Sequence, residues 1–430
     1  MQRRNFLQLC SAAGLGFASP LCRDTLAQTA AAKQQLPSYD GPYYVVFNAS
    51  GGWDTTYMMD PKGIGGINRL YKDSDILSEG NLQFAPTKKH IEKGMSNEAF
   101  FAKYAKELLV LNGIDYSVNN HAPCSRYMAT GELDNASFPT FAALIAGCKG
   151  SDVPLAFLTF GNFSGTGNIV PMSRVPYLPS LSKLANADGV QGNSKSPFHD
   201  DFVTDRIERA LAEQLQTRIK AKRLPRVERS QSMLFAAQVN SKALKRVTPF
   251  IPKKAAEGRL PRQADIALAS FKAGVCVSAN LSIGQFDSHA NNDRDQMKLI
   301  PEFLSGIDYL MTKAEELKIR EKLVVVIQSE MGRTPNYNKG QGKDHWSVGS
   351  IMFVGKGIKG NRVIGKTDEK QFLTPVNAST LALDRDNGIR IRPEHIHEAL
   401  RSHAGIANHE FSERFPLKVQ PEERLTKLFA

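Results

Sequence analysis

Residues 323–334 read LVVVIQSEMGRT, an apolar run that ends in a serine and a glutamate. The five consecutive apolar residues from Leu323 to Ile327 are typical of a strand that is buried on both faces. A carboxylate such as Glu330, directly after such a strand, is costly to bury unless a partner compensates its charge. That partner could be a metal ion or Arg333, and the simpler alternative is a Glu–Arg pair at the surface.

Apolar runs of the same kind alternate with helical patterns along the rest of the chain. Strands are expected at 43–48, 108–111, 155–160, 274–281 and 351–354, and helices at 139–148, 295–317 and 393–403. Such alternation indicates a parallel sheet that is covered by helices on both faces. The expected fold is therefore α/β, a three-layer α/β/α sandwich with a mainly parallel central sheet.

Residues 175–270 differ from the rest of the chain. They contain helical patterns, few strand runs and many basic residues, including RIKAKR at 218–223. We expect a mainly helical insertion there, with its charge on solvated helix faces rather than in a binding patch. One α/β domain over residues 31–430 accommodates this length.

The amino terminus, MQRRNFLQ, places Arg3 and Arg4 side by side ahead of Phe6 and Leu7. This pattern is typical of a twin-arginine signal, and the apolar stretch that follows is shorter than the ~20 residues of a stable anchor. We expect residues 1–30 to be a cleaved signal peptide. The folded chain would then reach the periplasm or the exterior through the twin-arginine translocase. An ordinary secretion signal or an uncleaved anchor is the alternative.

The formal net charge is +12, which favours anionic partners. No nucleic-acid recognition motif accompanies the charge, so nucleic acid is not an expected partner. The chain has five cysteines and no CxxC pair, so a zinc site made of thiolates is not expected either.

Four clusters of polar residues each follow a predicted strand. They are Gly51-Gly52-Trp53-Asp54, Asp287-Ser288-His289, Ser329-Glu330-Met331-Gly332-Arg333-Thr334 and Gly342-Lys343-Asp344-His345-Trp346. Ligands of open α/β sheets bind at the carboxyl ends of the strands, so we expect the acids and histidines of these clusters to converge on one site. Alternatively each cluster caps its own loop, and Asp54 in particular suits a turn or a helix cap.

A fifth segment, HAPCSRYMATG at 121–131, has the pattern of a loop that enters a helix. The unpaired N–H groups at the amino end of a helix attract oxyanions. His121 stands at this point.

These segments, in this order, resemble the domain-of-unknown-function 1501 family over roughly residues 41–385. The marks of that family are Asp-x-His, Ser-Glu-x-Gly-Arg-Thr and Gly-x-Asp-His-Trp. The family is similar to the alkaline phosphatase and sulfatase superfamily. The resemblance implies an alkaline phosphatase-like fold and one or two divalent ions (zinc, calcium or magnesium) beside a nucleophile.

The resemblance also implies roles for single residues. The implied metal ligands are Asp54, Asp287, His289, Glu330, His345 and either a ligating or an orienting Asp344. His121 stands at the place of the nucleophile and would act as nucleophile or general base, while Arg333 or Lys343 would steady the anion. Cys124-Ser125-Arg126 imitates the sulfatase motif without its spacing, so formylglycine is not expected.

The resulting hypothesis is an exported, metal-dependent hydrolase of phosphate or sulfate esters. Its substrate would be a small anionic ester or a sulfated or phosphorylated glycan. The alternative is a non-catalytic envelope protein that keeps the fold and binds a ligand, or that assembles with another envelope protein.

Overall fold

The structure is a computed structural model that describes residues 37–161, 163–185, 200–220 and 240–430. The predicted signal peptide, residues 1–30, lies outside the described residues. Within the described ranges, no helix combines the length and the apolar character that a membrane span requires.

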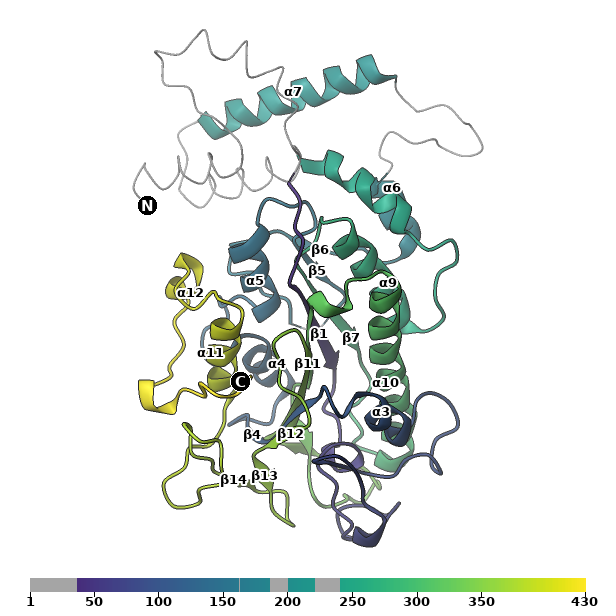
Figure 1. Cartoon of the computed structure of the whole chain (residues 1–430), viewed down its shortest axis with the longest axis vertical. Coiled ribbons are helices and arrows are strands. Elements are labelled where there is room, and N and C mark those ends of the chain that lie inside the picture. Colours follow the sequence, from purple (N-terminus) through teal and green to yellow (C-terminus); the bar gives the residue numbers. More distant parts are fainter. Residues whose placement is uncertain (1–36, 162, 186–199, 221–239) are drawn as a thin grey trace.

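An eight-stranded sheet runs through the centre of the molecule in the order β12-β4-β11-β8-β1-β7-β5-β6 (Figure 1). Its strands are β1 (Tyr43–Ala49), β4 (Leu109–Asp115), β5 (Phe157–Thr159), β6 (Met172–Ser173), β7 (Ser278–Ile283), β8 (Leu323–Ser329), β11 (Val348–Gly355) and β12 (Arg362–Ile364). All neighbouring pairs are parallel except the two that β11 makes with β4 and β8. The expected mainly parallel sheet is confirmed.

The alternating side chains of the central strands divide the interior into two cores. On β1, Tyr43, Val45 and Phe47 belong to one core, whereas Tyr44 and Val46 belong to the other. Because successive side chains of a strand point to opposite faces, a strand that is apolar throughout needs cover on both sides. The three-layer arrangement follows from this pattern.

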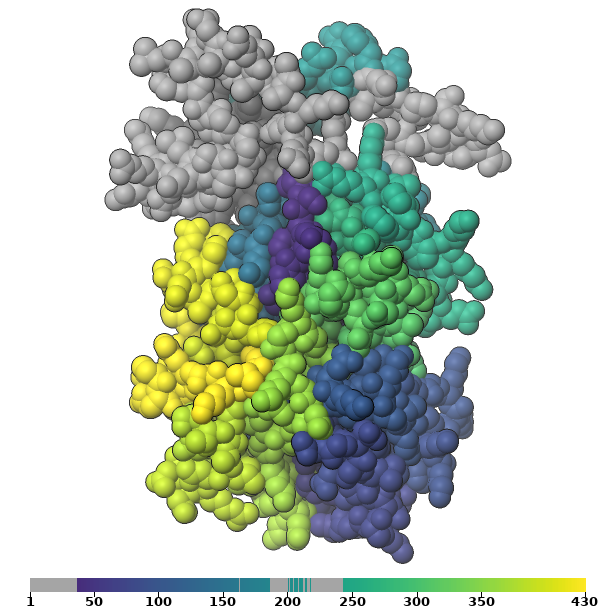
Figure 2. Space-filling view, in the orientation of Figure 1, coloured from purple at the N-terminus to yellow at the C-terminus, as the bar shows by residue number. Residues whose placement is uncertain are grey.

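Helices supply that cover on each face. The first core is closed by α3 (Asn97–Tyr104), α9 (Arg259–Lys272) and α10 (Asn292–Glu316), and the second by α4 (His121–Thr130), α5 (Phe141–Gly150) and α11 (Pro393–His403). In space-filling form, α11 and the short α12 (Glu410–Arg414), in yellow, lie on one side of the molecule and the green α9 and α10 on the other (Figure 2). The helices expected at 139–148, 295–317 and 393–403 correspond to α5, α10 and α11.

The described parts of the range 175–270 contain helices and no strand. It contains α6 (Leu178–Ala185), α7 (Asp201–Lys220), the 3-10 helix η3 (Asn240–Phe250) and α9. However, α9 packs against α10 and β7. The last helix of this range is therefore part of the sandwich itself.

One edge of the sheet collects the carboxyl ends of four strands. Ala49 on β1 is aligned with Ile283 on β7 and with Ser329 on β8, so the chain leaves all three strands at the same level. β4 runs in the same direction, because β11 is antiparallel both to β4 and to β8. The loops that follow β1, β4, β7 and β8 are thereby brought together.

Candidate metal centre

His121 reaches this edge as the first residue of α4. The side chain of Asn120 caps the helix by accepting a hydrogen bond from the Ala122 N–H. The His121 ring lies between two acids: its Nδ1 is 3.1 Å from Glu330 Oε1, and its Nε2 is 3.3 Å from Asp287 Oδ2. The predicted loop-to-helix segment is thus present, and it aims His121 at the loop after β7.

Asp287 is the meeting point of three imidazoles. Its Oδ1 lies 3.1 Å from His289 Nε2 and 3.3 Å from His345 Nε2. The Nε2 atoms of His289 and His345 are 3.0 Å apart. His121, Asp287 and His345 each offer an atom within 4.8 Å of the others, as a metal ion requires. The predicted convergence is therefore found for Asp287, His289 and His345, and His121 joins them from the fifth segment.

In each imidazole, the nitrogen that does not face Asp287, Nδ1, is contacted by an oxygen atom. Glu330 Oε1 lies 3.1 Å from His121 Nδ1, Asp344 Oδ1 lies 2.8 Å from His289 Nδ1, and the Asn119 carbonyl lies 2.8 Å from His345 Nδ1. A carbonyl can only accept, so the proton of a neutral His345 sits on Nδ1. In His121 and His289 both ring nitrogens face carboxylates, and a proton on Nδ1 is the tautomer that leaves Nε2 able to bind a cation. In that tautomer three Nε2 lone pairs face the Asp287 carboxylate.

This donor set fits a divalent cation. When the Nε2 atoms of His289 and His345 are both unprotonated, their 3.0 Å separation beside a carboxylate is repulsive unless a positive charge lies among them. Imidazole nitrogens with one carboxylate oxygen form a common set of zinc ligands, and an oxygen partner behind each ring is the usual arrangement around such ligands. The side chains are also open to solvent, since Asp287 is 41% and His289 46% exposed, so solutes can reach the centre.

Arg333 is a buried support of Asp287. Its Nη2 donates to Asp287 Oδ1 at 2.7 Å and to the Gly51 carbonyl, while Nε and Nη1 donate to the carbonyls of Gly52 and Lys343. Burial alone would raise the pKa of Asp287, but the hydrogen bond and charge of Arg333 outweigh it and lower that pKa. Arg333 thus keeps Asp287 ionised, and its own donors are committed to the protein.

The acids around the imidazoles also shift proton affinities. The hydrogen bond to Glu330 is the main reason why the pKa of His121 is raised. The hydrogen bond from His289 lowers the pKa of Asp344. Each imidazole–acid pair is therefore held in its hydrogen-bonded form.

Glu330, a predicted ligand, lies one imidazole away from Asp287. Its Oε1 accepts from the Gly51 N–H at 2.8 Å as well as contacting His121. Gly51 has φ 120°, and a Cβ there would lie 2.5 Å from the Asp287 backbone nitrogen. Only glycine lets the loops after β1 and β7 approach this closely. In the described structure Glu330 positions His121 and does not face the other two imidazoles.

Asp54 and Lys343 form a separate, fully buried pair. Asp54 Oδ2 lies 2.7 Å from Lys343 Nζ and also accepts from Asn292 Nδ2. Asp54 Oδ1 accepts from the Thr56 N–H and hydroxyl, which caps the 3-10 helix η1 (Thr55–Tyr57). Among the described residues, no contact joins Asp54 to the three imidazoles. Both oxygens of Asp54 and the charge of Lys343 are used within the fold, so the structure does not bring either residue to the centre as ligand or anion holder.

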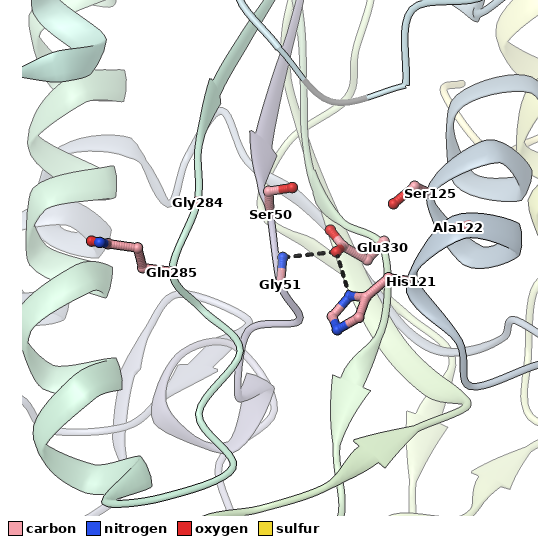
Figure 3. A pocket seen from close by; sticks show the side chains of 8 residues that line it. All are labelled: Ser50, Gly51, His121, Ala122, Ser125, Gly284, Gln285 and Glu330. Atoms are coloured by element: carbon pink, nitrogen blue, oxygen red, sulfur yellow. Dashed lines mark hydrogen bonds and ion pairs between the residues drawn. The ribbon is translucent and has the colours of Figure 1, made fainter.

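An open pocket of about 420 Å³ adjoins His121 (Figure 3). It is lined by Ser50, Gly51, His121, Ala122, Ser125, Gly284, Gln285 and Glu330. The predicted nucleophile position, His121, is the only imidazole in this lining, and its Nε2 is turned toward Asp287. Cys124, next to the pocket in sequence, is fully buried, and burial raises the pKa of its thiol to about 11.

The sequence matches the family described as "Protein of unknown function (DUF1501)" over residues 45–401. The chain belongs to this family. The match confirms the resemblance drawn from the motifs. No curated protein matches the chain.

Solved structures similar to this DUF1501 protein include sulfatases and alkaline phosphatases. The PsFucS1 sulfatase from Pseudoalteromonas sp. is 11% identical with a TM-score of 0.39, and the match covers 100% of this chain and 77% of the sulfatase chain. The alkaline phosphatase from the Antarctic bacterium TAB5 is 9% identical with a TM-score of 0.31, and the match covers 76% of this chain and 95% of the phosphatase chain. An alkaline phosphatase superfamily protein from Vibrio parahaemolyticus is 8% identical with a TM-score of 0.33, and the match covers 94% of this chain and 76% of the Vibrio chain. Scores this low carry no conclusion about activity.

The DUF1501 motifs meet through a small ribbon. β9 (Gly332–Arg333) pairs with β10 (His345–Trp346), which aligns Arg333 with His345. The Ser-Glu-x-Gly-Arg-Thr and Gly-x-Asp-His-Trp motifs therefore both contact Asp287, through Arg333 and His345. Sequence reasoning missed three participants, the Asn119 carbonyl, Ser50 and Ser125. The position of Ser50 directly after a strand could have indicated it, but a backbone carbonyl has no sequence signature.

Proposed function

We propose that this protein is an exported, metal-dependent hydrolase of phosphate or sulfate esters. It would hold one divalent ion with His121, His289, His345 and Asp287. The observation that carries the proposal is the convergence of three imidazole Nε2 atoms on Asp287, each ring fixed at Nδ1 by an oxygen. Nitrogen-rich sets suit zinc, whereas calcium and magnesium prefer oxygen ligands. Zinc is therefore the ion we propose.

A divalent ion bound there would supply Lewis-acid activation of an ester oxygen or of water. The residues of the chain prepare the place for it. Glu330 and Asp344 keep His121 and His289 oriented, and Arg333 holds the Asp287 carboxylate in place. The pocket beside His121 offers room for the ester, which we propose to be a small anionic ester or a sulfated or phosphorylated glycan.

We also propose export by the twin-arginine translocase to the periplasm or the exterior. The support is the Arg3-Arg4 pair ahead of a short apolar stretch. This route carries folded proteins, which suits a centre whose ligands come from three separated segments.

One observation favours a second candidate, a non-catalytic metal-binding protein of the envelope. Ser50 and Ser125 line the pocket, yet among the described residues no base accepts a hydrogen bond from either hydroxyl. A protein of this kind would bind metal and ligand without turnover.

Metal analysis with an activity screen tests the proposal. Purified protein, dialysed against a weak chelator, should retain about one zinc per chain. It should also hydrolyse 4-nitrophenyl phosphate, 4-nitrophenyl sulfate or bis(4-nitrophenyl) phosphate. His345→Ala should lose both properties. His403→Ala is the matched control, because His403 bonds to the Lys356 carbonyl and has no contact with the centre. Zinc without turnover would favour the envelope protein, and equal zinc in His345→Ala would overturn the metal centre.

A further inference from the structure

The pocket beside His121 contains a hydrogen-bond acceptor that lacks a donor. Glu330 is 3% exposed, and among the described residues its Oε2 has no hydrogen-bond partner. Its Oε1 is engaged by the Gly51 N–H and by His121. Figure 3 shows the second oxygen pointing away from His121, toward the side of the pocket where Ser50 and Ser125 lie. A buried acceptor left unpaired is destabilising, so we expect a bound molecule to donate a hydrogen bond to this oxygen.

The described lining of the same pocket has no permanently charged cation. No lysine or arginine occurs in its lining within the described chain. The two cations at the same edge are occupied elsewhere: Arg333 by Asp287 and three carbonyls, and Lys343 by Asp54. Both side chains are buried to their full extent. Within the described lining, only His121 faces the charge of Glu330, and it does so at Oε1 rather than at Oε2.

We propose that this pocket admits esters with a single negative charge and a hydroxyl donor, and discriminates against the dianion of a phosphate monoester. The hydroxyl donates to Glu330 Oε2 and satisfies it. A second negative charge would be repelled by the buried carboxylate, because charges interact strongly where water is excluded. Sulfate monoesters and hydroxyl-bearing phosphodiesters meet both conditions. The inference rests on the proposed function and narrows its substrate class.

Glucose 6-sulfate and glucose 6-phosphate are suitable probes, because they share shape and hydroxyls and differ in charge. Their affinities for the zinc-loaded protein are measured by isothermal titration at about pH 8, where the phosphate is a dianion since its second pKa is about 6. Glu330→Gln removes the charge, and its amide oxygen can still accept from Gly51 and His121. With both proteins saturated with zinc, so that a change in zinc affinity does not enter the ratio, we expect the affinity for the phosphate to rise about ten-fold relative to the sulfate. Ser125→Ala, an uncharged change in the same pocket, should leave the ratio unchanged.

A second measurement needs no variant. Lowering the pH to about 6 protonates half of the phosphate and none of the sulfate. The wild-type affinity for glucose 6-phosphate, relative to the sulfate, should then rise at least about five-fold. A flat or falling ratio, or a zinc-loaded Glu330→Gln with unchanged selectivity, would overturn the inference while leaving the metal-dependent hydrolase intact. Absence of zinc from the wild type would instead remove the proposed function.

Discussion

At the scale of single residues, the acids behind the imidazoles account for the order of the centre. Asp344 contacts His289 Nδ1 at 2.8 Å while its side chain is 58% exposed, so its removal should leave the fold intact. Loss of such a partner weakens metal binding by about 10–100-fold. We therefore expect Asp344→Ala to bind zinc about 10–100-fold more weakly in competition with a chromophoric chelator. Asp386→Ala, an exposed control, should bind zinc as the wild type does.

The Asp54–Lys343 pair leads to a different prediction. Removing one member of a fully buried ion pair leaves an uncompensated charge, which costs about 3–5 kcal/mol. We expect Lys343→Met to lower the free energy of unfolding by about that amount in urea titrations, and Asp54→Asn combined with Lys343→Met to recover most of it. If Lys343 instead held the substrate, Lys343→Met would raise KM without changing stability.

The sequence predicts which residues meet, but it does not predict which of them face the metal site and which support a ligand from behind. His121, Asp287, His289 and His345 follow or precede strands of one sheet, so their convergence follows from topology. The ligand or supporting role of Glu330, Asp344 and Asp54 depends on side-chain direction. In Asp54 the local cap on Thr56 and the pairing with Lys343 decide that direction, and neither has a signal in the order of residues.

At the scale of elements, the close approach of the loops after β1 and β7 depends on Gly51. A Cβ there would lie 2.5 Å from the Asp287 nitrogen, and the φ of 120° is itself unfavourable for other residues. We expect Gly51→Ala to destabilise the fold by about 2 kcal/mol or more and to weaken zinc binding, because Asp287 must shift. Gly66→Ala has open space around its Cβ and should leave the melting temperature unchanged. Wild-type zinc affinity in Gly51→Ala would contradict this role of the loop.

The direction of a strand in the sheet could not be predicted from the sequence in the way that the strand itself could. The apolar run at 351–354 predicts a buried strand, and β11 is one. Its antiparallel direction depends on the link from β8, which contains only the β9–β10 ribbon and no crossover helix. Parallel neighbours require such a crossover, so the ribbon both reverses β11 and delivers His345 to the centre. An apolar run alone is the same in either direction.

At the scale of the whole molecule, the centre and the predicted export route constrain each other. The ligands come from three segments, so the metal site exists only in the folded chain, and a route that carries folded proteins would deliver it intact. We expect Arg3→Lys combined with Arg4→Lys to leave a full-length precursor in the cytoplasm, measured by fractionation and immunoblot. Arg23→Lys, a matched change outside the paired arginines, should be exported normally. Because folding precedes transport, the stranded precursor should still bind zinc. Normal periplasmic amounts of the double variant would refute the twin-arginine route, and a zinc-free precursor would show that the centre is completed only after export.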